Sequence, residues 1–355
     1  MKIRAVTLLL LGILPIVGAE HVAAREKTDV LVMRNGDRLT CEIKALKADV
    51  LYVSLDYVLG TISVNWFQVD HVESVQPFVI RTSGGEVYSG RIKMPGTGRN
   101  RPVEIEVLGP EGESSSIPVS EISHVDQSNQ KLLQRFNGSV GLGAIYNKGN
   151  QSTQYNLASD ISYPRDRWSA SVSYNSTLSS NQNTSASSRN QLDASAQRLL
   201  PWNHWYYTGF ADFLQSTEQG IDLQSALGGG IGRYLKNSNH ASISVAGGFA
   251  FQRITYQQNI VTAPTEDVAS AWLNAQARLF RFDRTSLVVT TSLLPALSDP
   301  GRLHFNLNTS YYIKIWGKFN FDVSFYGNWD NQPPFGFSKS DYGASSGLSW
   351  TFGNR

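Results

Sequence analysis

His304 is the side chain best suited to acid–base chemistry, in the stretch Gly301-Arg302-Leu303-His304-Phe305-Asn306. An imidazole can take a proton from a serine and so drive acyl transfer. That chemistry needs the nucleophile within hydrogen-bond reach of the ring, whereas Leu303 and Phe305, which flank the histidine, are apolar. We therefore predict no enzyme activity and no catalytic residue, with a hydrolase that uses His304 as the alternative.

His71 and His124 end two similar segments, Val69-Asp70-His71-Val72 and Ile122-Ser123-His124-Val125. Together they could form a metal or proton site, but no Cys, Asp or Glu cluster joins them at ligand spacing. We expect structural histidines copied by duplication, with neither metal nor cofactor. Cys41, the only cysteine, cannot form an internal disulfide and is expected to be a small buried residue.

The last two-thirds of the chain alternates apolar and polar residues, which is typical of strands with one apolar and one polar face. In residues 303–315 the odd positions are mostly apolar and the even positions polar. This pattern predicts an all-β fold, a transmembrane antiparallel barrel of about 12 strands over residues 136–355. The expected strands are 136–146, 152–163, 167–178, 189–200, 204–215, 223–235, 240–252, 268–281, 284–294, 302–315, 318–328 and 341–352.

The connections between these strands alternate between short and long. Outer-membrane barrels place short turns in the periplasm and long loops outside, and an even strand number leaves both barrel ends in the periplasm. One of the longer loops is expected from Ser179 to Ser188. Aromatic residues near the strand ends, Tyr234 and Tyr256 among them, are expected to form the two interfacial girdles.

The inward rows are mostly small and neutral, and their charges are sparse and mixed. Twelve strands lie between a filled eight-stranded barrel and an aqueous sixteen-stranded channel. Small inner residues favour a narrow pore, although inward Trp272, Tyr312 and Tyr326 could equally plug it. Mixed charge predicts weak ion selectivity at best. The predicted lumen-lining residues are Asp160, Asp193, Trp272, Arg278, Tyr312, Lys314, Asp322 and Tyr326.

The N-terminal region has a different composition. Residues 1–19 read as a secretory signal peptide with a basic start and an apolar run. Residues 25–126 are denser in charge and hold two repeats, 29–75 and 78–126, with tight-hairpin signals at Asn35-Gly36 and Gly84-Gly85. They predict a small periplasmic β module of the SH3-like or Sm-like kind, and residues 127–135 a linker.

The formal net charge of +2 and the absence of a basic block exclude a nucleic-acid partner. The expected location is the bacterial outer membrane, with the module in the periplasm. Expected partners are outer-membrane lipid and lipopolysaccharide and the barrel-assembly machinery, together with peptidoglycan or a periplasmic protein for the module. A narrow channel and a structural role in envelope stress both fit this description.

Residues 136–355 resemble the putative salt-induced outer-membrane protein family, domain of unknown function 481. The similar motifs are Gly141-Leu142-Gly143, Lys148 to Thr153, Tyr155 to Tyr163, Asp193 to Ala196, and Ser225 to Tyr234. The resemblance implies an outer-membrane barrel and supplies no substrate or catalytic residue. The segment around His304 also resembles phospholipase-like barrels, which need Ser where Phe305 stands, so the alternative enzyme would be an outer-membrane lipid hydrolase.

Overall fold

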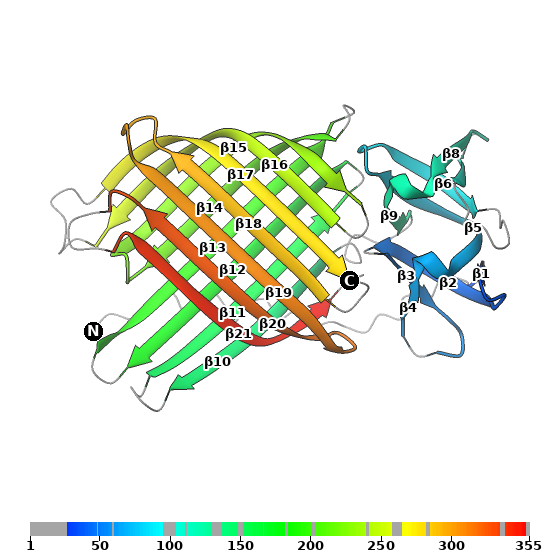
Figure 1. Cartoon of the computed structure of the whole chain (residues 1–355), viewed down its shortest axis with the longest axis horizontal. Coiled ribbons are helices and arrows are strands. Elements are labelled where there is room, and N and C mark those ends of the chain that lie inside the picture. Colours follow the sequence, from blue (N-terminus) through cyan, green and yellow to red (C-terminus); the bar gives the residue numbers. More distant parts are fainter. Residues whose placement is uncertain are drawn as a thin grey trace.

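The computed structural model has two regions, a small N-terminal module and a large barrel (Figure 1). The predicted signal peptide and most of the predicted linker lie outside the described residues. No helix in the described part of the chain is long and apolar enough to cross a membrane. The structure describes residues 27–47, 49–58, 60–94, 104–110, 112–128, 136–147, 152–165, 167–181, 184–200, 204–238, 241–257, 265–281, 285–333 and 338–352.

The module is one nine-stranded sheet in the order β4-β3-β2-β1-β5-β6-β7-β8, with β9 paired to β2 and β5. A short 3₁₀ turn precedes the last strand of each half, η1 (Trp66–Gln68) and η2 (Val119–Glu121). The strands are β1 (Asp29–Met33), β2 (Arg38–Lys47), β3 (Val50–Ser54), β4 (Ile62–Asn65), β5 (Val69–Thr82), β6 (Val87–Met94), β7 (Glu104–Leu108), β8 (Ser114–Pro118) and β9 (Ile122–Gln127).

Strand β5 joins the two halves. Its first part pairs with β1 of the first half, Leu31 opposite Val72. Its second part pairs with β9 of the second half, Val79 opposite Asp126, and its register with β6 shifts between Glu73 and Pro77. One strand therefore ends the first repeat and begins the second, which confirms the small barrel-like module with two repeats.

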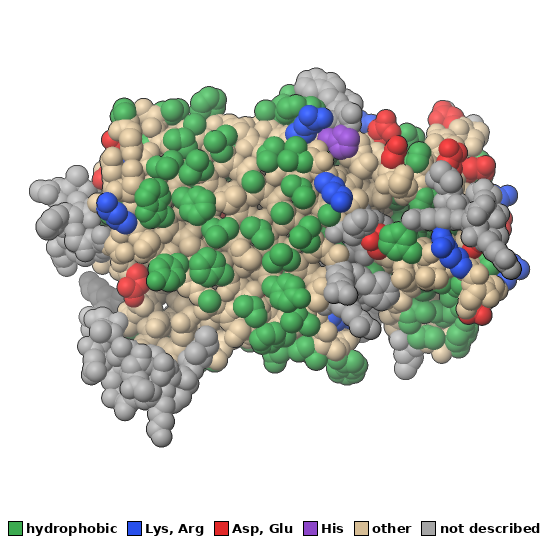
Figure 2. Space-filling model, viewed as in Figure 1, with side chains coloured by type: hydrophobic (Ala, Val, Ile, Leu, Met, Phe, Trp, Pro, Cys, Tyr) green, Lys and Arg blue, Asp and Glu red, His purple; other side chains and the backbone are tan. Residues whose placement is uncertain are grey.

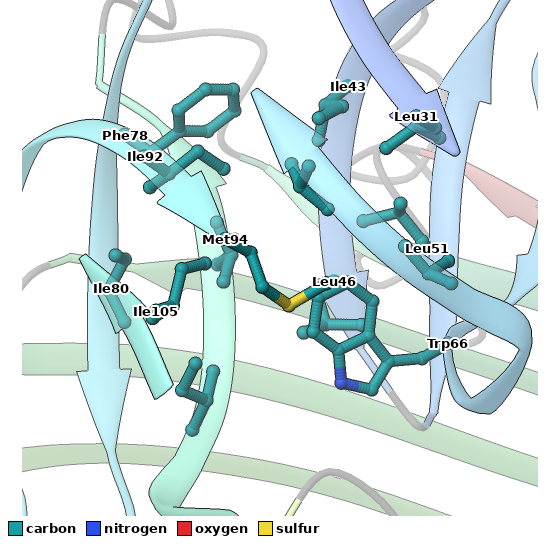
Figure 3. Packing of buried hydrophobic residues seen from close by; sticks show 14 of the residues in the cluster. Leu31, Ile43, Leu46, Leu51, Trp66, Phe78, Ile80, Ile92, Met94 and Ile105 are labelled. Carbon is teal, nitrogen blue, oxygen red and sulfur yellow. The ribbon is translucent and has the colours of Figure 1, made fainter. Parts of the chain in front are cut away.

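The two halves share one hydrophobic core. Met94 extends from the second half toward Leu46 and Trp66 of the first half, and all three side chains are buried (Figure 3). Phe78 on β5 is completely buried. Burial of this apolar area stabilises units that would be marginal alone.

Asp29 is a buried carboxylate of the module, and both of its oxygens have partners. Asp29 Oδ2 accepts a hydrogen bond from the Ile43 backbone N–H at 2.7 Å, and Ser74 Oγ donates to Asp29 Oδ1. Cys41, opposite Asp29 on β2, is completely buried. Burial, with the charges of Asp29 and Glu42, raises the pKa of the Cys41 thiol to about 12. The thiol is therefore protonated and inert, as expected of a small buried residue.

The barrel is closed and has twelve strands, each antiparallel to the next. It closes where β10 pairs with β21, Gly138 opposite Phe352. The predicted fold class is thus confirmed. The strands are β10 (Asn137–Asn147), β11 (Ser152–Pro164), β12 (Trp168–Asn181), β13 (Thr184–Leu199), β14 (Trp205–Ser216), β15 (Ile221–Asn237), β16 (Ala241–Tyr256), β17 (Thr265–Arg281), β18 (Thr285–Pro295), β19 (Leu303–Trp316), β20 (Phe319–Asp330) and β21 (Ser340–Phe352).

Apolar side chains cover the outer face of the barrel, whereas few charged ones are visible on it (Figure 2). Phe249, Leu273 and Tyr342 are examples, and more than half of the surface of each is exposed. Large apolar side chains are costly to expose over such an area unless a non-aqueous partner covers them. The exterior therefore has the chemistry of a transmembrane barrel.

One expected loop is wrong. The connection predicted from Ser179 to Ser188 is mostly strand, since Asn181 pairs with Thr184 across β12 and β13. Residues 176–190 are rich in Ser, Asn and Thr, so they lack the two-faced pattern used to place the strand ends. Backbone pairing needs no such pattern, and the hairpin continues beyond the apolar band.

The module lies beside the end of the barrel that carries the tight turns (Figure 1). The backbone N–H of His204, between β13 and β14, donates to the carbonyl of Gly84 in the β5–β6 turn at 3.1 Å. The hairpin predicted at Gly84-Gly85 is thus also a contact with the barrel.

Candidate functional site

The candidate site is the barrel lumen, whose inner face is set by the alternation along each strand. On β21, Leu348 is 59% exposed on the outer face, whereas Ser349 beside it is 3% exposed on the inner face. Asn308 on β19 and Ser171 and Asn175 on β12 also lie on inward rows, yet they remain exposed. Solvent reaches these inner side chains, so the interior is only partly filled.

The residues predicted to line the lumen all fall on inward rows, but they do not form a single cluster. Arg278 on β17 and Lys314 on β19 lie near the turn end of their strands. Tyr326 on β20 lies toward the loop end, where the Arg189 guanidinium is 4.7 Å from its ring. Tyr312 on β19 is directly opposite Asp322 on β20.

Three aspartates lie in one cross-strand row. Asp160 on β11 is opposite Ser173 on β12, Ser173 is opposite Asp193 on β13, and Asp193 is opposite Asp212 on β14. Gln191 Nε2 donates to Asp193 Oδ1 at 3.3 Å and to Asp212 Oδ2 at 2.9 Å. One amide therefore holds two carboxylates side by side.

Asp322 on β20 lies beyond the closing strands and outside this row. It is opposite Gly347 on β21, whereas the row of Asp160 reaches β21 at Thr351. A Cβ on Gly141 would be 3.2 Å from Ser349 Cβ and 3.5 Å from Asp322 Oδ1, so both side chains lie over this glycine. Ser139, two residues before Gly141 on the same face of β10, donates to Asp160 Oδ2 at 3.5 Å. We name Asp160, Asp193, Asp212 and Asp322 the acidic arc.

The wall from β14 to β18 is aromatic and apolar. Tyr206, Ala246, Ala250, Trp272 and Leu294 form a buried cluster, against which Leu199, Phe210 and Tyr234 pack. The ring centroids of Phe210 and Trp272 are 4.7 Å apart, and those of Tyr206 and Tyr234 are 4.9 Å apart. Trp272 is only 7% exposed, because it is part of this wall.

Two glycines on β15 make room for these rings. A Cβ on Gly228 would overlap the Phe210 ring, and a Cβ on Gly232 would overlap the Tyr206 ring. Glycine alone permits so close an approach. The rings therefore lie against the wall, and they leave the space beside β12 and β19 to solvent.

Arg302, just before β19, is the centre of a polar cluster at the loop end. It is 5% exposed and lies 2.8 Å from Glu266 Oε2 and 2.9 Å from Asp330 Oδ2. Tyr256 Oη also donates to Glu266 Oε2, at 3.2 Å. A second loop-end pair joins Arg189 on β13 to Asp341 on β21 at 2.9 Å. The Arg302–Glu266 pair thus joins the start of β19 to β17, and the Arg189–Asp341 pair joins β13 to β21.

His124 of the module lies near the turn end of the lumen. Burial lowers the pKa of His124 to about 4. The positive charges of Arg81, Lys47 and the barrel's Arg278 also lower this pKa, whereas the negative charge of Asp126 opposes them. Arg81 and Lys47 form ion pairs with Asp126 at 3.4 and 3.7 Å.

For several residues the structure differs from the sequence-based prediction, or the sequence pattern gave no prediction. Tyr234 and Tyr256, expected in the girdles, face the lumen, where Tyr234 Oη donates to Gln197 Oε1 at 3.2 Å. Outward Ile231 and Phe251 occupy odd positions on the same strands. The even positions of Tyr234 and Tyr256 therefore already indicated the inner face. Arg302, expected to begin the strand 302–315, lies just before β19, and the alternation does not indicate its acidic partners. The strand that carries Asp212 alternates less cleanly, so its sequence alone does not show that this carboxylate faces the lumen.

His304 forms half of the arrangement that a hydrolase needs. Its Nε2 is 3.1 Å from Asp330 Oδ2, which also holds Arg302. Phe305, where phospholipase-like barrels need a serine, falls on the opposite, outward row of β19. The described contacts thus link His304 to the loop-end ion pairs and not to a hydroxyl nucleophile.

His71 and His124 do not share a metal site in the described structure. No group of three or more His, Cys, Asp or Glu residues in the described ranges is arranged to hold a metal ion. His71 lies 3.7 Å from Glu73, whereas His124 is opposite Arg81. The duplicated histidines thus have different partners.

Comparison with known families and proteins gave one family match. The model for "Protein of unknown function, DUF481" matches residues 140–352, more than half of the chain and nearly the whole barrel. No curated protein matches.

Solved structures with a similar fold include the translocator domain of autotransporter NalP from Neisseria meningitidis. It has 10% identity and a TM-score of 0.34, over 61% of this chain and 86% of that one. CdiB from Escherichia coli has 15% identity and a TM-score of 0.35, over 71% and 53%. A Pseudomonas aeruginosa FadL homologue has 12% identity and a TM-score of 0.25, over 92% and 87%. The architecture described above rests on this chain's own strand pairing.

Proposed function

The chain belongs to the DUF481 family of proteins of unknown function, and from that premise we propose that it is a non-enzymatic outer-membrane barrel forming a narrow channel for small polar solutes. A structural role in envelope stress is the competing role for the same barrel. The observation that carries the channel is the exposure of Ser171, Asn175 and Asn308 inside a closed barrel. A plugged barrel would bury such inner side chains.

The proposed location follows from the two faces of the strands. The apolar exterior suits outer-membrane lipid and lipopolysaccharide, and Trp350 and Phe352 near the end of β21 suit recognition by the barrel-assembly machinery. The module beside the turn end would then lie in the periplasm. There it would bind peptidoglycan or a periplasmic protein.

Conductance tests the channel. Refolded full-length protein added to a planar lipid bilayer should give discrete, small current steps. Membranes that stay silent at all protein concentrations would contradict the channel and leave the structural role. Binding of the same protein to purified peptidoglycan, measured by co-sedimentation, tests the role of the module separately.

Cell fractionation tests the location. The mature protein should be in the outer-membrane fraction and should migrate differently on a gel before and after boiling, as stable barrels do. Protein that stays soluble after cell lysis would contradict the membrane assignment.

A lipid hydrolase is the alternative, because the His304–Asp330 pair resembles a base with its orienting carboxylate. We expect no release of fatty acid from phospholipid vesicles by the wild type or by His304→Ala. Activity that is present in the wild type and lost in His304→Ala would establish the enzyme.

A further inference from the structure

We propose that the acidic arc binds hydrated inorganic cations and makes the pore prefer cations over anions. The inference rests on the proposed channel and names the solute class that it favours. The arc lies on strands β20, β11, β13 and β14, so it follows the lumen wall around the closure of the barrel. Rings of carboxylates are the usual means by which pores select cations.

Like charges placed side by side need compensation. Asp193 and Asp212 are directly opposite each other, an arrangement that destabilises a sheet when both groups are charged. The Gln191 amide donates to both carboxylates but is itself neutral. A cation beside the pair would remove the repulsion, and the solvated side of the lumen gives it access.

A second observation comes from the closing strands. Asp322 is 9% exposed and Ser349 is 3% exposed. Among the described residues, neither Asp322 Oδ1 nor Ser349 Oγ has a hydrogen-bond partner. Both side chains lie over Gly141, toward the Asp160 end of the arc. A buried carboxylate oxygen with a serine hydroxyl beside it offers oxygen ligands of the kind that a hard cation takes.

The remaining lumen charges leave the arc dominant. At the loop end, Arg189 and Arg302 are held in ion pairs by acidic partners. Arg278 and Lys314 lie nearer the turn end, on β17 and β19. Among the described side chains at the lumen wall, the acidic ones outnumber the basic ones: Asp160, Asp193, Asp212, Glu266, Asp322, Asp330 and Asp341 against Arg189, Arg278, Arg302 and Lys314.

Reversal potentials in a potassium chloride gradient test the preference. The wild-type pore should be several-fold more permeable to potassium than to chloride. This permeability ratio should fall toward one in Asp193→Asn/Asp212→Asn. The control Asp267→Asn removes one carboxylate from the outer row of β17 and should keep the wild-type ratio. A wild-type pore without cation preference, or an unchanged ratio in the double variant, would overturn the proposal. Gel migration before and after boiling verifies that each variant is folded.

A second readout does not depend on conduction. Terbium ions added to refolded protein in detergent should luminesce when tyrosine is excited, because Tyr312 is opposite Asp322. The signal should drop several-fold in Asp322→Asn/Ser349→Ala and stay unchanged in Asp267→Asn. If bilayers are silent but this signal depends on the arc, the channel fails and the cation site stands. Luminescence that is absent, or equal in the wild type and the double variant, would reject the site.

Discussion

The module and the barrel use β-strands in opposite ways. In the module, apolar residues point into one shared core, and Tyr57 is a rare exposed aromatic side chain. In the barrel, the large apolar residues point outward and the inner face carries most of the polar ones. The same two-residue period thus produces a water-soluble unit when the apolar face is inside, and a membrane-spanning one when the apolar face is outside.

This contrast determines what a substitution should do in each region. An apolar side chain in the module is stabilised by packing against protein, so its truncation leaves a cavity. An apolar side chain on the barrel exterior is stabilised by lipid, so truncation costs little and a charge costs more. Four experiments test the contrast, beginning with the largest expected effect.

Truncation of the module core should have the largest effect. Phe78→Ala removes a completely buried ring from β5, the strand shared by both halves, and should cost about 3–5 kcal/mol of module stability. Hydrogen exchange of module peptides in the refolded full-length protein should accelerate strongly. Tyr57→Ala, at a largely exposed site, is the control and should change nothing. Unchanged exchange in Phe78→Ala would mean that the two halves do not depend on a common core.

A charge on the barrel exterior should have the next largest effect. Leu307 faces outward and Asn308 inward near the middle of β19. Leu307→Arg should cost about 2–4 kcal/mol, as expected for a charge at the midplane of a bilayer. Asn308→Arg places the same side chain in the solvated lumen and should cost much less. Urea unfolding of both variants in lipid vesicles measures the difference. Equal losses would contradict the assignment of the two faces.

The faces of the strands were predictable from sequence because the polarity of neighbouring residues determines each face. Leu307 and Asn308 differ in polarity within one dipeptide, and neighbouring pairs repeat that contrast. The repeat in the module was also visible, since Asn35-Gly36 and Gly84-Gly85 mark matching hairpins. Strand ends were less predictable: Asn181 and Thr184 pair in a polar stretch where alternation carries no information.

The candidate site could be predicted only residue by residue. The alternation along each strand is sufficient to place Asp193 and Asp322 on the inner face. The contact of Asp322 and Ser349 over Gly141 depends on the register in which β10 closes on β21. Closure joins segments about two hundred residues apart, and no periodic pattern specifies its register. The Arg302 cluster also depends on pairing beyond one hairpin. Asp330 lies on β20, which pairs with β19, but Glu266 comes from β17.

Acid should destabilise the module by a moderate amount. The pKa of His124 is lowered to about 4 in the folded state, below its ordinary value of 6.5. Between those values the unfolded chain binds a proton that the folded chain does not, so stability falls as the pH drops through this range, by on the order of 1–2 kcal/mol. The pKa of Asp126 is also lowered, by Lys47 and Arg81 against the effect of burial. Its contribution is lost only at lower pH, below 3.8.

Hydrogen exchange of module peptides from pH 7 to pH 4, corrected for intrinsic rates, measures this loss. His124→Asn should flatten the profile between pH 6.5 and pH 4. His71→Asn replaces the matching histidine of the first repeat and serves as the control for loss of a histidine. A profile that keeps its slope in His124→Asn would assign the acid sensitivity to another group.

The smallest effect is expected from an ion pair on the outer row of the barrel. Arg253 on β16 and Asp267 on β17 form two hydrogen bonds, at 2.8 and 2.9 Å, but both side chains are exposed near the loop end. Water and salt screen such pairs, and the ordering of two side chains opposes the attraction. Replacing both residues with Ala should leave urea unfolding in vesicles unchanged. A clear loss of stability would mean that the pair lies within the bilayer, where water does not screen it. The apolar band would then extend to the loop-side ends of β16 and β17, and the polar rim of the barrel would be narrower than its exposed charges indicate.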